Sequence, residues 1–124
     1  MGELQLAIMR VLWQCGEATV AVVHEQLPKA SRRALTTIAT MLKKLELKGA
    51  VDHRTEGRVF VYRPLVSEAA VQRSMVSQLT QRLFDGDPAR LVSHLLNESE
   101  LDPRELSELA ERIAREEASQ EGQQ

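Results

Sequence analysis

The sequence has few aromatic residues and no long apolar run. Of its 124 residues only 3% are Phe, Trp or Tyr, whereas 43% are apolar overall. A core built mostly from Leu, Val, Ile and Ala favours helices over a β-sandwich. The apolar stretches are too short to span a bilayer. The first residues do not show the pattern of a secretion signal, which is a basic segment followed by an apolar stretch and a cleavage site. We therefore expect a cytoplasmic protein with one domain, or a small domain with an appendage.

The residues that build metal sites, disulfides and catalytic motifs are also scarce. The single cysteine, Cys15, cannot form an internal disulfide. The three histidines, His24, His53 and His94, lack the spacing of metal ligands. There is no glycine-rich phosphate loop and no nucleophile motif. We predict no metal site, no cofactor and no enzymatic activity.

The overall charge of −2 conceals two halves of opposite sign. Residues 1–66 contain ten Lys and Arg against six Asp and Glu, a net of +4, whereas residues 67–124 contain six against twelve, a net of −6. The basic half could meet a polyanion that the acidic half would repel. We therefore expect two domains with different tasks, 1–66 and 67–124.

The first half contains three segments in which apolar residues recur at helical spacing. Each segment is followed by a residue that ends helices, namely Gly16, Pro28 or Gly49. The expected helices are Glu3 to Gln14, Val20 to Leu27 and Leu35 to Lys48.

Two short segments after the third helix predict a β-hairpin. Ala50–Arg54 and Arg58–Arg63 are rich in Val, Phe and Tyr, and they flank the turn sequence "TEG". Three helices followed by a hairpin is the order of elements in a winged helix-turn-helix domain. The predicted fold class is therefore mainly α with a small β-hairpin wing.

The third predicted helix has one apolar side and one polar side. The apolar side carries Leu35, Ile38, Leu42 and Leu45. The opposite side carries Thr36, Thr40 and Lys43, with Thr37 and Lys44 on a flank. Leu47 also falls on the polar side and does not fit this pattern.

A helix with short hydroxyl and ammonium side chains suits the major groove of DNA, because it can approach base edges while cations meet phosphates. Arginines flank the start of the helix and the turn of the hairpin. The predicted DNA-binding residues are Arg32, Arg33, Thr36, Thr37, Thr40, Lys43, Lys44, Lys48, Arg54 and Arg58. The alternative is a winged helix that binds an acidic protein partner through the same basic face.

The second half predicts three helices whose apolar stripes are too lean to close a domain alone. A second copy of the chain is the simplest partner, since two-fold pairing is the commonest oligomer symmetry. We expect residues 67–124 to form a helical dimerisation domain. The predicted dimerisation residues are Val71, Met75, Leu79, Leu83, Leu91, Leu95, Leu106, Leu109 and Ile113.

Three stretches, "ELQLAIMRVLW", "TTIATMLKKLELKGAV" and "GRVFVYRPLVS", resemble the penicillinase repressor family, which includes the methicillin-resistance and copper-operon repressors. The resemblance implies a homodimeric transcriptional repressor on a palindromic operator, with the helix at about 35–48 in the major groove. It places the wing, about 54–59, on the flanking backbone or minor groove. The matching residues are Glu3, Ile8, Met9, Leu12, Trp13, Thr36, Thr37, Ile38, Thr40, Lys48, Gly49, Gly57, Arg58, Tyr62 and Pro64.

The chain departs from the family pattern in three places. Lys44 stands where the family often has Arg, which loses the planar fork suited to bidentate contacts. The Asn-Phe bond cut in β-lactam-responsive members is replaced by His94-Leu95 or its neighbours. The paired Cys-x-Cys motifs of the copper-responsive branch are missing. These departures argue against direct copper sensing and leave a sensor protease open as a partner.

Overall fold

The computed structural model describes residues 1–98 and 102–121 and divides the chain into two compact units, Met1–Val76 and Ser77–Gln124. The division lies inside a helix, α4 (Glu68–Phe84), and not at residue 66 where the charge changes sign. The assignment of DNA binding to residues 1–66 and of dimerisation to 67–124 stays a prediction.

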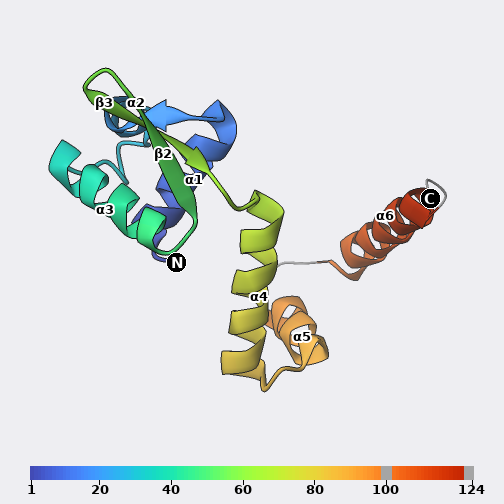
Figure 1. Cartoon of the computed structure of the whole chain (residues 1–124). Coiled ribbons are helices and arrows are strands. Elements are labelled where there is room, and N and C mark those ends of the chain that lie inside the picture. Colours follow the sequence, from blue (N-terminus) through green and yellow to red (C-terminus); the bar gives the residue numbers. More distant parts are fainter. Residues whose placement is uncertain (99–101, 122–124) are drawn as a thin grey trace. The chain divides into compact units, whose positions relative to one another are not determined.

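The first unit contains three helices, a small sheet and the beginning of α4 (Figure 1). The predicted order of three helices followed by a hairpin is confirmed, and the predicted helix ends differ by one residue from those observed. The elements before α4 are α1 (Glu3–Cys15), β1 (Ala18–Thr19), α2 (Val20–Gln26), α3 (Leu35–Leu47), β2 (Val51–Glu56) and β3 (Val59–Pro64).

Local chemistry explains where α2 begins and ends and where α3 ends. The Thr19 hydroxyl accepts a 3.2 Å hydrogen bond from the Val22 backbone N–H, which caps the start of α2. Leu27 leaves helical geometry because Pro28 follows it. Gly49 adopts a φ of +81° directly after α3 and turns the chain into β2.

The sheet has the strand order β1-β3-β2, with both pairs antiparallel. The hairpin turn is shorter than the sequence predicted, because Thr55 and Glu56 continue β2 and Glu56 pairs with Val59. Only Gly57 and Arg58 remain in the turn, and Gly57 has a φ of +61°. A two-residue turn with glycine first matches the twist of the flanking strands. The strand β1 was not predicted, since two residues carry no detectable alternation.

The core of the first unit is aliphatic, and the sheet covers it with Val51 and Tyr62. The helices contribute completely buried side chains, namely Ile8, Met9, Leu12, Val23, Ile38, Leu42 and Leu45, and Leu27 adds another directly after α2. Leu35 lies on the predicted apolar side of α3 but does not join this core, since its side chain is 49% exposed. It is the first residue of α3 and lies one turn before Ile38, beyond the edge of the core.

The second unit contains the C-terminal part of α4, α5 (Pro88–Glu98) and α6 (Pro103–Glu121). Asp87 caps α5 and Asp102 caps α6 through hydrogen bonds of 3.0 Å to backbone N–H groups. Figure 1 shows α5 beside α4, where the rings of Phe84 and His94 lie 5.7 Å apart. Among the residues the structure describes, no helix has both the length and the apolar character needed to cross a membrane.

Candidate nucleic-acid interface

The outer face of α3 presents a straight row of four exposed side chains. Thr36, Thr40, Lys43 and Leu47 are spaced by four, three and four residues, which places them within a narrow arc of the helix. The buried residues Ile38, Leu42 and Leu45 lie on the other side. The core therefore fixes which side chains α3 shows to a partner. Leu47, which is 83% exposed, belongs to this row and not to the core.

The hydroxyl of Thr40 is already used as a donor. Its Oγ1 donates a 2.9 Å hydrogen bond to the carbonyl oxygen of Thr36, one turn earlier in α3. A hydroxyl has one proton and two lone pairs, so Thr40 can only accept further hydrogen bonds while this bond is kept. Such a group can accept from a base amino group or touch a methyl group, but it cannot donate to a phosphate.

The lysines along α3 provide positive charge for a polyanion. Lys43 and Lys44 are exposed and form no hydrogen bond or ion pair within the described part of the chain. Lys48 donates a 3.0 Å hydrogen bond to the side-chain oxygen of Gln5, a neutral partner. No carboxylate among the described residues therefore offsets the charge of these three ammonium groups.

Arg32 and Arg33 lie in the loop before α3 and bind backbone carbonyls. Arg32 donates hydrogen bonds of 3.0 Å to the carbonyl oxygens of Glu25 and Leu27, at the end of α2. Arg33 donates to the carbonyl oxygen of Ala30 at 3.4 Å and to that of Arg32 at 3.2 Å. Neither guanidinium is paired with a carboxylate among the described residues, so no ion pair offsets the charge of either one. The positive charge of Arg32 also stabilises the C-terminus of α2, where the helix dipole is negative.

The two arginines predicted in the wing have different surroundings. Arg58, in the turn, is exposed and has no hydrogen-bond or ion-pair partner in the ranges that the structure covers. Arg54, on β2, is held by two carboxylates. It donates to Glu17 at 2.5 and 2.9 Å and to Glu56 at 2.7 and 3.2 Å. The wing therefore offers one unengaged guanidinium, not two.

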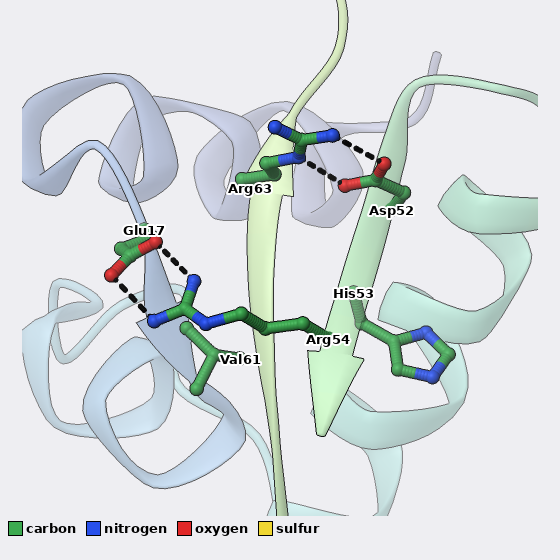
Figure 2. Close-up of a pocket in the computed structure, with 6 residues that line it drawn as sticks. All are labelled: Glu17, Asp52, His53, Arg54, Val61 and Arg63. Atoms are coloured by element: carbon green, nitrogen blue, oxygen red, sulfur yellow. Dashed lines mark hydrogen bonds and ion pairs between the residues drawn. The ribbon is translucent and has the colours of Figure 1, made fainter. Parts of the chain in front are cut away.

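The ion pairs cover one face of the sheet, as Figure 2 shows. Asp52 and Arg63 face each other across β2 and β3 at 2.6 and 3.0 Å, and Arg54 reaches over Val61 to Glu17. The guanidinium of Arg63 lowers the pKa of Asp52, and hydrogen bonds from Arg54 lower the pKa of Glu17. These groups surround a hollow of about 320 Å³.

The opposite face of the sheet carries aromatic side chains and contacts α3. His53 binds Glu46 of α3 through Nδ1, and its ring stacks on Phe60 with centroids 4.2 Å apart. Tyr62 lies 5.4 Å from the same imidazole. His53 therefore links the wing to the C-terminal part of α3.

The sequence did not single out Glu17, Glu46 or His53 as parts of this arrangement. Strand alternation could have placed Asp52, Arg54 and Glu56 together on one face of β2, since every second residue faces the same way. The partners Glu17 and Glu46 lie in other elements, so no local spacing connects them with the wing.

A second hollow, about 340 Å³ and mostly apolar, lies between the starts of α2 and α3 and the wing. It accounts for the exposure of Leu35, which lines it beside Phe60 of β3. Its other lining residues are Thr19, Val20, Ala21, Arg58 and Val59. No cluster of three or more His, Cys, Asp or Glu side chains that could hold a metal ion occurs in residues 1–98 or 102–121.

The residues predicted for dimerisation differ in burial. Val71 is 9% exposed and lies in the first unit, so it is already covered within one chain. Met75, Leu91 and Leu106 are half-buried. The remaining five, between 43% and 65% exposed, are Leu79, Leu83, Leu95, Leu109 and Ile113.

Three helices and a short wing, with a basic outer face on the third helix, define a winged-helix protein of the DNA-binding type. A family model described as penicillinase repressor matches residues 1–115. The chain belongs to the penicillinase repressor family, a family of transcriptional repressors.

Individual relatives agree with this membership. The chain is 32% identical over 109 residues to the penicillinase repressor of Bacillus licheniformis, covering 88% of this chain and 85% of that one. It is 32% identical over 98 residues to the transcriptional regulator BlaI of Mycobacterium tuberculosis, covering 77% and 71%. The solved DNA-binding domain of the repressor BlaI shares 39% identity with a TM-score of 0.50, over 56% of this chain and 84% of that chain.

Proposed function

We propose that the protein represses transcription by placing α3 in the major groove of an operator, with the wing turn on the flanking backbone or minor groove. The observation that carries this proposal is the outer row of α3, where Thr36, Thr40 and Lys43 stand opposite a fully buried side. Threonine can contact base edges, and the unpaired lysine can meet a phosphate.

The contact surface combines groups of two kinds. The threonines of α3 are placed to read bases, whereas Lys43, Lys44, Lys48, Arg32, Arg33 and Arg58 supply charge for phosphates. The similarity to the solved DNA-binding domain of BlaI supports this assignment, because that domain is 39% identical to this chain over 56% of this chain's length. We infer a cytoplasmic location from the same proposal, since an operator-binding repressor has to reach chromosomal DNA.

We propose further that two chains pair through their second units on a two-fold-symmetric operator. The support is the apolar surface that a single chain leaves open, with Leu83 at 65% and Ile113 at 47% exposure. Burying such side chains against a second copy removes apolar area from water, which stabilises the pair by about 25 cal/mol per Å². Pairing would then fix the spacing between two α3 helices.

Control by a sensor protease would require a cleavable bond in the second unit. The segment that replaces the family's cleavage site, His94-Leu95, lies inside α5. A helix must open locally before a protease can bind it as an extended strand. We therefore propose that release from DNA does not depend on cutting at this position.

The test is fluorescence anisotropy with a duplex from the protein's own promoter region and a scrambled duplex of equal length. We expect tighter binding to the promoter duplex and a steep loss of affinity with salt. Equal affinity for the two duplexes would reject sequence-specific repression. Absence of DNA binding together with a co-purifying acidic protein would favour the protein-interaction module instead.

A further inference from the structure

Arg54 of β2 is the most heavily engaged cation of the wing. Its Nε, Nη1 and Nη2 nitrogens all donate to carboxylate oxygens, at distances between 2.5 and 3.2 Å. A guanidinium whose whole donor fork faces two carboxylates has little left to offer a phosphate. Its surroundings raise the pKa of Arg54, with the Glu17 hydrogen bond as the largest cause.

The two carboxylates bound by Arg54 belong to different parts of the fold. Glu56 lies on the same strand as Arg54, two residues further along, so this pair stays within β2. Glu17 lies between α1 and β1, so the other pair crosses the sheet. Arg54 passes over Val61, its cross-strand neighbour, which is only 6% exposed (Figure 2). The Glu17–Arg54 pair thus ties the outer strand of the wing to the segment before α2.

The electrostatics of this sheet face argue against contact with DNA. It carries the carboxylates of Glu17, Asp52 and Glu56 and the guanidiniums of Arg54 and Arg63, a net of −1 from two cations and three anions. A surface with this balance is repelled by a polyanion. The unengaged cation of the wing, Arg58, lies in the turn.

We propose that Arg54 is a positioning residue, which binds Glu17 to hold the wing so that Arg58 can reach the DNA backbone. This replaces the prediction that Arg54 itself contacts DNA, and it rests on the proposed function as an operator-binding repressor. Arg54 acts through Arg58, because the pair with Glu17 fixes where β2 and the following turn lie.

The decisive variant is Glu17→Gln, since the two roles predict effects of opposite sign. If Arg54 met a phosphate, losing Glu17 would free its charge and tighten DNA binding. If Arg54 positions the wing, Glu17→Gln weakens operator binding although the protein becomes less negative. We expect a loss of about fivefold near 0.15 M salt, the value for one lost phosphate contact with a slope of about 0.9.

Glu56→Gln is the matched control. Like Glu17→Gln, it removes one negative charge that is paired with Arg54. The Glu56–Arg54 pair, however, lies within β2 and connects no second element. We expect tighter operator binding than in the parent, because the wing loses a negative charge while the Glu17–Arg54 pair is kept. A loss as large as that of Glu17→Gln would overturn the proposal, because it would show that any partner of Arg54 matters equally.

The coupling to Arg58 is measured with a double-mutant cycle. Arg58→Ala should weaken binding about fivefold in the parent and have little further effect in the Glu17→Gln background. Circular dichroism and thermal unfolding of each variant check that the fold is kept. Equal losses from Arg58→Ala in both backgrounds would overturn the proposal.

Arg54→Lys provides a second, independent variant. Lysine keeps the charge for a phosphate but lacks the planar fork that binds Glu17 and Glu56 together. We expect it to weaken operator binding as Glu17→Gln does, and parent-like binding would overturn the proposal. If the unaltered protein does not prefer its operator over scrambled DNA, the proposed function itself fails, and this outcome is separate from the comparison of variants.

Discussion

The indole nitrogen of Trp13 donates a 2.9 Å hydrogen bond to the carbonyl oxygen of Val66, 53 residues later in the chain. The bond joins the end of α1 to the segment between β3 and α4, and the indole packs on the core of the first unit. It is therefore a long-range anchor for the beginning of α4.

Replacing Trp13 with phenylalanine should weaken this anchor. Trp13→Phe removes the donor and leaves the Val66 carbonyl without its partner, so we expect a loss of about 1–3 kcal/mol in the free energy of unfolding. Urea denaturation measures this loss. Unfolding is followed by circular dichroism, because the variant lacks the only tryptophan of the sequence and therefore has no tryptophan fluorescence. An unchanged midpoint would show that the bond does not stabilise the unit.

Thr40 allows a test of how α3 reads DNA. Thr40→Val keeps the shape and one methyl group but removes the oxygen that can accept a hydrogen bond, whereas Thr40→Ser keeps the oxygen and removes the methyl. If Thr40 accepts from a base, Thr40→Val should reduce the preference for operator over scrambled DNA by about 1–3 kcal/mol. A larger loss for Thr40→Ser would assign the contact to a thymine methyl group instead. Anisotropy titrations with both duplexes provide the comparison, and parent-like specificity in both variants would contradict a base contact.

Lys43 should contribute charge and no sequence information. Lys43→Ala should weaken binding to operator and scrambled DNA by similar factors and lower the slope of log affinity against log salt by about 1. Arg112→Ala, which removes the same charge from an exposed position of α6, serves as control. A slope unchanged from that of the parent would mean that Lys43 meets no phosphate.

The pair of Asp52 and Arg63 predicts an acid-sensitive sheet. Because Arg63 lowers the pKa of Asp52 below its ordinary 3.8, the pair stabilises the fold above that value. Its contribution is lost as the pH falls through the lower pKa of the folded state. Between about pH 5 and pH 2, the midpoint temperature of thermal unfolding should therefore fall less for Asp52→Asn than for the parent. Glu108→Gln, on α6, should follow the parent, and identical curves for Asp52→Asn and the parent would contradict the prediction.

The exposed leucines of the second unit should control assembly. Leu83→Glu places a charge where we expect a second copy to pack, so it should shift the protein to monomer and weaken operator binding. Gln78→Glu adds the same charge at an exposed polar position of α4 and should stay dimeric. Sedimentation equilibrium over a range of concentrations distinguishes the two. A dimeric Leu83→Glu variant would place the interface elsewhere.

Much of the first unit could be predicted because its signals are local. The spacing of Ile38, Leu42 and Leu45 indicates the buried side of α3 and therefore its outer row. Glycine and proline mark the ends of the helices. Spacing alone could not show that Leu35, the first residue of α3, lies beyond the edge of the core.

The arrangement around the wing could not be predicted in the same way. The sequence shows Arg54 as a cation near a turn, and its partner Glu17 lies 37 residues earlier. Only the pairing of β1 with β3 brings the two together, and β1 is too short to leave a pattern. The charge of a side chain is visible in a sequence, but whether another charge neutralises it depends on the tertiary fold.

The apolar residues that α4, α5 and α6 leave exposed have a consequence for dosage. A protein that pairs through them exists as single chains and pairs in a ratio set by its abundance. When pairs are the minor form, halving the abundance reduces them to about a quarter. Repression would then respond more than proportionally to synthesis and dilution in a growing cell, even without any inducer.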